Sequence, residues 1–344
     1  MRYPHAFAAI LTLAVPFGGP TSAERVRASH TVAAHSRAMA DTLSVTVRGL
    51  DTRRTDMRGL AFRTVVSRVP TADGRQDAPP VERRAARMVV VLIPGPVGSA
   101  FSMRHITDAL ATDSVPTIVI DPLGMGTSSR PGNADYTLMR QATRIAAILD
   151  TLRVERALIV GQGTSASIAL HLAASDTARV QAVLSLAGGP VDKQGTRGVR
   201  LALTLAPLLD NGLGRAIGRR KFRHAVRDQS ASMTWCTDSV LRAYLGPYER
   251  DLRGSLRALR AMNDAIEPVP LASRLGSIRA PVRLLMGDKI SANAPTAEQV
   301  ALLQRSLTRF AVDTVARAGT MLQEERPDAV LMAIRALLHP PARP

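Results

Sequence analysis

The sequence predicts an α/β fold in which helices flank a mainly parallel central sheet and a helical lid is inserted before the last strands. Apolar runs of strand length alternate with amphipathic runs of helix length over residues 88–188 and again over residues 280–338. Such alternation requires crossover connections between parallel strands. The intervening residues 190–273 instead contain helical segments that are rich in leucine and arginine. We expect these residues to cover the carboxyl edge of the sheet as a lid.

The chain begins with the pattern of an export signal. Arg2 gives a positive start, residues 6–17 are mostly apolar, and small residues that end at Ala23 offer a cleavage site. The apolar run is too short to span a bilayer. We therefore expect residues 1–23 to be a signal peptide, residues 24–40 to be a polar linker, and the protein to be secreted or periplasmic. A disordered leader on a cytoplasmic protein is the alternative.

The first part of the core, residues 41–189, is expected to open with strands at 42–47 and 60–69, which a charged turn separates. Residues 88–96, MVVVLIPGP, begin with a continuous apolar run that is typical of a strand covered on both faces. The later elements of this part are expected to alternate between helix and strand, beginning with a helix, at residues 102–113, 115–121, 138–153, 156–161, 165–175 and 180–188.

The lid is expected to contain helices at residues 200–209 and 252–262, where leucine and arginine recur at helical spacing. The last part of the core, residues 274–339, returns to the alternating pattern. Two strands separated by a helix and followed by a second helix are expected there, at residues 280–288, 296–307, 310–319 and 327–338.

Composition and charge narrow the possible partners. The formal net charge is +17, yet aromatic residues make up only 3% of the chain and no nucleic-acid recognition motif is present. Because nucleic-acid binding usually combines a basic face with such a motif or with stacking aromatics, we expect no nucleic-acid partner. Basic residues are densest over residues 197–227, which we expect to form a solvated helix face or to make weak contact with an anionic membrane surface.

Disulfide and metal chemistry find little support in the sequence. Cys236 is the only cysteine, so no intrachain disulfide is possible and the stability of the fold must come from its core. Histidine and carboxylate residues do not cluster with metal-ligand spacing. We therefore expect neither a metal nor a cofactor.

Five loop motifs follow the expected strands in a fixed order: IPGPVGSAFSMR, DPLGMGTSSRP, VGQGTSAS, LLMGDKIS and ARAGTMLQEERPDAV. Together they resemble the α/β-hydrolase superfamily, specifically its capped, single-domain branch of esterases, epoxide hydrolases and haloperoxidase-like enzymes. The resemblance covers residues 42–338, and DPLGMGTS at residues 121–128 is its most specific element. It implies the α/β-hydrolase fold and a site built from a serine, an acid and a histidine.

The resemblance places this catalytic triad on residues that lack its chemistry. In VGQGTSAS, Gly163 falls on the nucleophile of the G-x-S-x-G motif. Ile290 falls on the acid, and Thr320 falls on the histidine. Pro96 falls on a loop residue whose N–H would help to bind an oxyanion, and proline has no N–H. This leaves the N–H of Thr164 as the one expected donor.

Substitute catalytic groups are sparse. Ser165 lies in GTSAS, which imitates a shifted nucleophile motif, but a serine or threonine at this point is also a typical helix cap. His105 and His224 could face the pocket as bases, whereas His171 has the position of a structural histidine. Asp121 is expected to bond the backbone of the turn that follows it. Asp288 occupies a position where the family commonly has a second, structural aspartate.

Two hypotheses follow from these residues. The first is a non-catalytic α/β-hydrolase-fold protein that binds a small apolar ligand or a partner protein, because the triad residues are replaced. An apolar ligand is expected because isoleucine and threonine at the acid and histidine positions make the pocket floor less polar. The alternative is an active serine hydrolase, esterase or lyase with relocated groups, such as Ser165 with His105 or His224. Fold resemblance alone cannot decide between them. The pocket is expected to be lined by Gly95, Pro96, Gly163, Thr164, Ile290 and Thr320.

Overall fold

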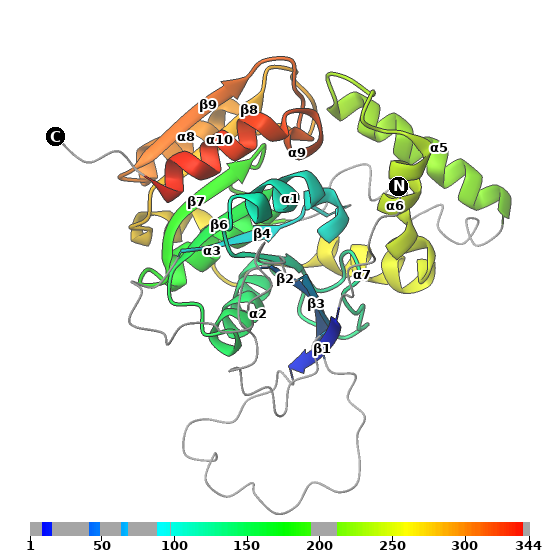
Figure 1. Ribbon diagram of the computed structural model, residues 1–344, viewed down its shortest axis with the longest axis horizontal. Coiled ribbons are helices and arrows are strands. Elements are labelled where there is room, and N and C mark those ends of the chain that lie inside the picture. Colours follow the sequence, from blue (N-terminus) through cyan, green and yellow to red (C-terminus); the bar gives the residue numbers. More distant parts are fainter. Residues whose placement is uncertain are drawn as a thin grey trace, which may run out of the picture.

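The nine strands described in the computed structural model form one sheet (Figure 1). The structure describes residues 9–15, 41–48, 63–67, 88–96, 98–193 and 212–339. Along the sheet the strands follow the order β1-β3-β2-β5-β4-β6-β7-β8-β9. Their bounds are Ala9–Val15 (β1), Asp41–Arg48 (β2), Arg63–Ser67 (β3), Val89–Ile93 (β4), Thr117–Asp121 (β5), Ala157–Gln162 (β6), Val180–Leu186 (β7), Val282–Gly287 (β8) and Phe310–Val315 (β9).

The sheet is parallel from β5 through β9, and β2 joins it antiparallel to β5. This arrangement confirms the predicted α/β class with a mainly parallel sheet. The bounds of the core helices are Ala100–Met103 (η2), Arg104–Thr112 (α1), Leu138–Thr151 (α2), Ser165–Ser175 (α3), Ala297–Ser306 (α8), Leu322–Glu325 (α9) and Pro327–Leu338 (α10). Five core helices, α1, α2, α3, α8 and α10, also lie where the sequence predicted them, within a few residues at each end, whereas the short helices η2 and α9 were not predicted.

The continuous apolar run of β4 is explained by helices on both of its faces. Val89, Val91 and Ile93 belong to the core that contains apolar residues of α2, α3 and α8. Val90 and Leu92 belong to a second core, which contains residues of α1 and α10. Because successive side chains of a strand point to opposite faces, a strand between two helix layers must be apolar at every position. Every residue of β4 is accordingly buried.

The segment expected to form the lid contains three described helices, Gly212–Gln229 (α5), Asp238–Glu249 (α6) and Leu252–Asp264 (α7), followed by the 3-10 helix Leu271–Ser277 (η4). We use the name lid for this segment. Figure 1 shows α5 and α6 to one side of the sheet, with α5 reaching away from it. The predicted helix at 252–262 is confirmed as α7, whereas the one at 200–209 lies outside the described residues. Cys236 is buried in a small lid core with Val226 and Leu241.

The N-terminal strand lies inside the segment predicted to be a signal peptide. β1 is the edge strand of the sheet and pairs antiparallel with both β2 and β3. Removal of residues 1–23 would therefore take away this edge strand. Export stays a prediction. No helix within the described ranges combines the length and apolarity needed to cross a membrane.

Candidate functional site at the contact between lid and core

The turn between β6 and α3 places Gly163 where the resemblance puts a nucleophile. Gly163 has φ +55°, a left-handed conformation that glycine adopts without strain, and a Cβ built on it would meet no atom within 4 Å. Two residues earlier, a Cβ on Gly161 would lie 2.6 Å from the carbonyl oxygen of Ser165. Gly161 therefore lets the strand and the helix approach closely, while position 163 faces open space without a side chain.

Ser165 does not have the contacts of a nucleophile. Its side chain is fully buried, and its Oγ donates a hydrogen bond of 2.7 Å to the carbonyl oxygen of Pro94. A hydroxyl carries one proton, and this one is held by a backbone carbonyl instead of a base. The expected helix cap is also wrong, because the N-cap residue Thr164 makes no side-chain cap bond. Ser165 instead ties the turn to the loop after β4.

The loop after β4 offers little to an oxyanion. The N–H of Gly95 donates to Oε1 of Gln162 at 2.9 Å, and Pro96 has no N–H to offer. From the lid helix α6, the Tyr248 hydroxyl lies 2.8 Å from the carbonyl oxygen of Pro96 and 3.2 Å from the N–H of Gly126, from which it accepts. Burial raises the pKa of this hydroxyl. Tyr248 thus joins the lid to two core loops directly beside the expected oxyanion site.

The acid position is turned away from the core. Ile290, expected to line the pocket, is 92% exposed, so that expectation is wrong. The reason is the residue before it, because Lys289 points at the lid and its Nζ donates to the carbonyl oxygens of Arg227 and Ser230 at 2.9 Å and 2.7 Å. Asp288 accepts bonds from the N–H groups of two loop residues, which lower the pKa of its carboxyl. Its predicted structural role fits these contacts.

The residue at the histidine position, Thr320, also contacts the lid. Thr320 is buried, and its N–H and Oγ1 donate to the backbone and side-chain oxygens of Gln229 at 2.8 Å and 3.2 Å. Beside it, Gly319 lies so near that a Cβ would come within 1.9 Å of the Gln229 carbonyl oxygen. We call this contact the lid anchor, formed by Arg227, Gln229 and Ser230 of the lid with Lys289, Gly319 and Thr320 of the core.

A buried carboxylate provides a second link between lid and core. The Glu324 side chain is inaccessible to solvent and accepts two hydrogen bonds from Arg104, at 2.6 Å and 2.7 Å. The Tyr244 hydroxyl of α6 donates to the same carboxylate at 2.6 Å. Burial, together with the nearby carboxylate, raises the pKa of Tyr244 well above its usual value. Nothing in the sequence distinguishes Glu324 from its acidic neighbours Glu325 and Asp328, so sequence reasoning missed this cluster.

The two candidate bases do not meet Ser165 in this structure. His105 Nε2 lies 3.6 Å from Oε2 of Glu324, and its side chain is 46% exposed. His224 is exposed on α5. The three relocated candidates thus have separate surroundings, and the structure does not bring them together as a catalytic group.

Several buried polar atoms near these contacts have no hydrogen-bond partner. They are Oγ1 of Thr164, Oγ of Ser230 and Nε1 of Trp235. Thr164 follows the nucleophile turn, whereas Ser230 and Trp235 lie between α5 and α6. A buried polar atom without a partner costs about 1–3 kcal/mol. Two hollows elsewhere, of about 400 Å³ and 280 Å³, include none of the six expected pocket residues.

Asp121 bonds the turn after β5, as the sequence predicted. One of its carboxylate oxygens accepts from the N–H of Thr127 at 2.9 Å, and a Cβ on Gly126 would lie 2.1 Å from that oxygen. Burial raises the pKa of Asp121 to about 6. The residue therefore shapes the loop that Tyr248 covers. Across the described ranges, no group of three or more histidine, cysteine or acidic residues could hold a metal ion.

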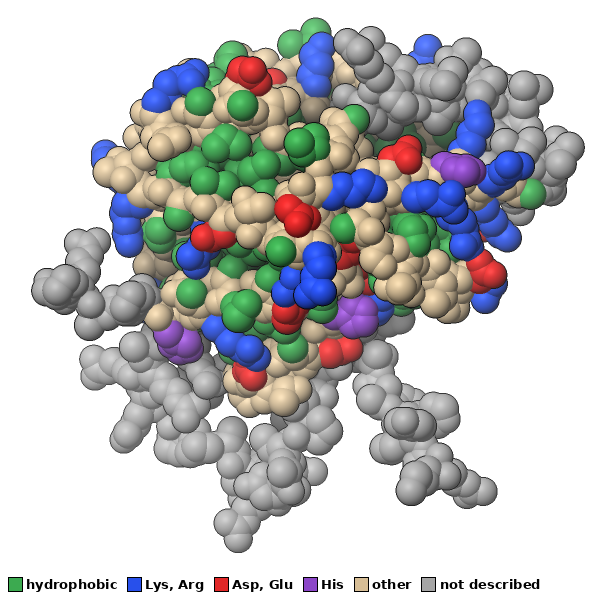
Figure 2. Space-filling model, turned by 90° about the horizontal axis from the view of Figure 1, so that it is seen from above, with side chains coloured by type: hydrophobic (Ala, Val, Ile, Leu, Met, Phe, Trp, Pro, Cys, Tyr) green, Lys and Arg blue, Asp and Glu red, His purple; other side chains and the backbone are tan. Residues whose placement is uncertain are grey.

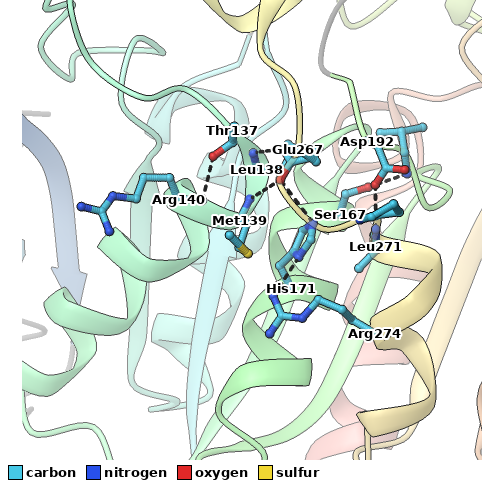
Figure 3. A network of polar contacts seen from close by, with 12 residues as sticks. Thr137, Leu138, Met139, Arg140, Ser167, His171, Asp192, Glu267, Leu271 and Arg274 are labelled. Carbon is cyan, nitrogen blue, oxygen red and sulfur yellow. Dashed lines mark hydrogen bonds and ion pairs between the residues drawn. The ribbon is translucent and has the colours of Figure 1, made fainter.

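A separate buried network joins the end of the lid to α2 and α3 (Figure 3). Glu267 caps the start of α2, where its carboxylate accepts from the N–H groups of Leu138 and Met139. His171 of α3 is fully buried, with Nε2 3.9 Å from Glu267 and Nδ1 3.4 Å from Arg274. Burial lowers the pKa of His171 to about 4. The predicted structural role of His171 fits these surroundings.

This histidine should make the protein less stable as the pH falls. Unfolded His171 binds a proton near pH 6.5, whereas the native side chain resists protonation until about pH 4. Between these values the unfolded state binds more protons, so stability is lost as the pH decreases, by about 3 kcal/mol in total. We expect the free energy of unfolding of His171→Asn, measured by urea titration at a series of pH values, to lack this part of the pH dependence. The control His105→Asn changes a half-exposed histidine and should keep the pH dependence of the wild type. An equal pH dependence of stability in the wild type and in His171→Asn would contradict the assignment.

Comparison with known proteins identifies the family. Residues 90–333 match the model of the alpha/beta hydrolase family, and the chain belongs to this family. A comparison of the sequence with curated proteins finds no match.

Solved structures share the fold at low sequence identity. An α/β hydrolase fold protein from Burkholderia ambifaria is 22% identical with a TM-score of 0.58, over 72% of this chain and 90% of the other. A meta-cleavage product hydrolase from Pseudomonas fluorescens is 18% identical with a TM-score of 0.58, over 73% of this chain and 90% of the other. The epoxide hydrolase CorEH is 18% identical with a TM-score of 0.57, over 75% of this chain and 93% of the other. These likenesses establish the α/β-hydrolase fold.

Proposed function

We propose that this protein is a non-catalytic member of the α/β hydrolase family that binds a small molecule or a partner protein where its lid meets its core. The observation that carries the proposal is the lid anchor. The two loops that would present the acid and the histidine of a triad instead hold the end of α5, through Lys289 and Thr320. A loop that holds the lid in this way is not free to orient a catalytic group.

The residues at the nucleophile and oxyanion positions also support a non-catalytic protein. Position 163 has no side chain, and the hydroxyl proton of Ser165 is held by a backbone carbonyl. The N–H of Gly95 is bonded to Gln162, and Pro96 has none, so only the N–H of Thr164 is left for an oxyanion. Removal of one oxyanion donor costs about 3–4 kcal/mol of transition-state stabilisation in known enzymes. Acid or base assistance alone supplies far less acceleration than a complete site.

Unpartnered polar atoms support a ligand at this contact. Thr164 and Ser230 carry buried hydroxyl groups, and Trp235 a buried indole N–H, that have no hydrogen-bond partner among the described residues. The ring of Trp235 lies 6.0 Å from that of Tyr244, which in turn stacks edge-on against Phe101. A guest with an apolar body and one or two polar groups would satisfy both features. This modifies the purely apolar ligand expected from the sequence.

Serine reactivity tests the proposal directly. We expect a fluorophosphonate probe to leave the purified full-length protein unlabelled, and p-nitrophenyl esters to be hydrolysed no faster than in buffer. The matched variant is Ser165→Ala, which removes the one serine with a nucleophile-like sequence context. Labelling of the wild type that disappears in Ser165→Ala would establish the alternative, an active hydrolase with relocated groups.

A further inference from the structure

The outer face of α5 carries an unusual concentration of positive charge. Six of the 18 residues of this helix are basic and only Asp228 is acidic; the basic residues are Arg215, Arg219, Arg220, Lys221, Arg223 and Arg227. The described exposed positions include Arg220, Lys221 and Arg227, with His224 between them. Residues 220, 224 and 227 recur at helical spacing and share one face. Figure 2 shows Lys and Arg side chains gathered over the lid on this side of the molecule.

Neutralisation is confined to the inner side of the helix. Arg219 forms a bidentate pair with Glu249, and Arg223 pairs with Asp238, both on the neighbouring helix α6. By contrast, the structure gives Arg220, Lys221 and Arg227 no ion pair with any described carboxylate. The exposed Asp228 lies four residues after His224 on this face, but the three cations outnumber it, so the outward face keeps a net positive charge. The lid anchor holds the C-terminal end of the helix against the core.

The apolar and aromatic residues of the lid point the other way. Val226 is buried in the small lid core, and Phe222 packs against it. The Phe222 ring also lies 6.4 Å from that of Tyr244. The outer face of α5 thus presents charge without exposed rings on which nucleic-acid bases could stack. A row of cations on one helix face is complementary to a broad anionic surface.

From this face we infer that α5 binds the anionic surface of a phospholipid membrane, as a peripheral electrostatic contact without insertion. Each Lys or Arg near such a surface strengthens binding by about fivefold, so three of them together contribute about a hundredfold. The contact does not depend on the small-molecule site, because the three side chains point away from the lid core. It predicts binding that falls steeply with salt, since exposed charges are screened over about 10 Å at 0.1 M.

Vesicle sedimentation tests this inference with the full-length protein. We expect binding to vesicles of phosphatidylcholine with about 30% phosphatidylglycerol at about 0.05 M salt, and its loss at about 0.5 M salt or on pure phosphatidylcholine. The variant Arg220→Gln/Lys221→Gln/Arg227→Gln should bind about a hundredfold more weakly. The control Arg279→Gln/Arg305→Gln/Arg309→Gln removes the same charge from three exposed arginines of the core and should bind within about threefold of wild type.

Three outcomes would overturn the inference. Wild-type protein could bind anionic and neutral vesicles equally, or the control could weaken binding as much as the α5 variant. A third is tighter binding to heparin or single-stranded DNA than to the anionic vesicles at the same salt, lost in the α5 variant, which would make the partner a soluble polyanion. Circular dichroism of both variants ensures that weaker binding reflects charge and not unfolding.

Discussion

Glu324→Ala should lower the free energy of unfolding by about 3 kcal/mol, because it removes the shared acceptor of Arg104 and Tyr244 from a buried site. Loss of one partner from a buried pair typically costs about 3–5 kcal/mol, and we expect the lower end because the Arg104 side chain is 23% exposed and can regain water. Urea denaturation at neutral pH measures this change. The lid should also open more readily, which hydrogen exchange of α6 would report.

A double-mutant cycle separates the lid contribution from the rest. Tyr244→Phe removes only the hydroxyl, and a hydrogen bond to a charged group contributes about 1.5–3 kcal/mol. In the Glu324→Ala background the same substitution should cost much less. Asp328→Ala is the matched control, since it breaks an exposed pair with Arg326 and should cost less than about 1 kcal/mol. Equal effects of Glu324→Ala and Asp328→Ala would mean that the buried cluster does not hold the lid.

Gly319→Ala should disrupt the lid anchor at the cost of about 3 kcal/mol in unfolding free energy. The new Cβ would lie 1.9 Å from the carbonyl oxygen of Gln229 and 3.0 Å from Cα of Ser230, both backbone atoms that cannot rotate away. Overpacking of this kind costs about 1–3 kcal/mol, and the displaced backbone would also lose the hydrogen bond from Thr320 N–H. Urea denaturation gives the total cost, and hydrogen exchange at residues 225–230 shows whether α5 detaches.

Gly276→Ala provides the comparison. A Cβ at this position meets no atom within 4 Å, so the substitution should change stability by no more than about 0.5 kcal/mol. If Gly319→Ala is as mild as Gly276→Ala, or if it destabilises the chain without faster exchange in α5, then Gly319 does not anchor the lid.

Much of the core could be predicted from the sequence because its signals are local. The run MVVVLIPGP places a doubly covered strand, and β4 is buried at every position. Regular alternation of apolar and amphipathic runs likewise predicts α1 to α3 and β5 to β9 within a few residues. The strand β1 was not predicted, because its apolar run also has the pattern of a signal sequence and its pairing partners lie far along the chain.

The site could be predicted only in part, for the same physical reason. Loop motifs place Gly163 at the turn and assign Asp121 and Asp288 to backbone contacts, since these depend on near neighbours in the chain. The orientation of Ile290 depends on a contact between its neighbour Lys289 and Arg227 of α5, which is 62 residues away in the chain. Arg104 and Glu324 are 220 residues apart, and no spacing rule connects them. Contacts of this length are set by packing of the lid, which sequence patterns do not encode.

The lid anchor has a consequence for how such a protein could change over evolutionary time. A histidine at position 320 would have to displace the Gln229 contact, and an inward-facing aspartate at 290 would require Lys289 to release two carbonyl oxygens. Neither replacement is accommodated while α5 keeps its present position against the core. Permissive substitutions near the end of α5 would therefore have to come first, so geometry constrains the order of mutational steps that would place an aspartate at position 290 and a histidine at position 320.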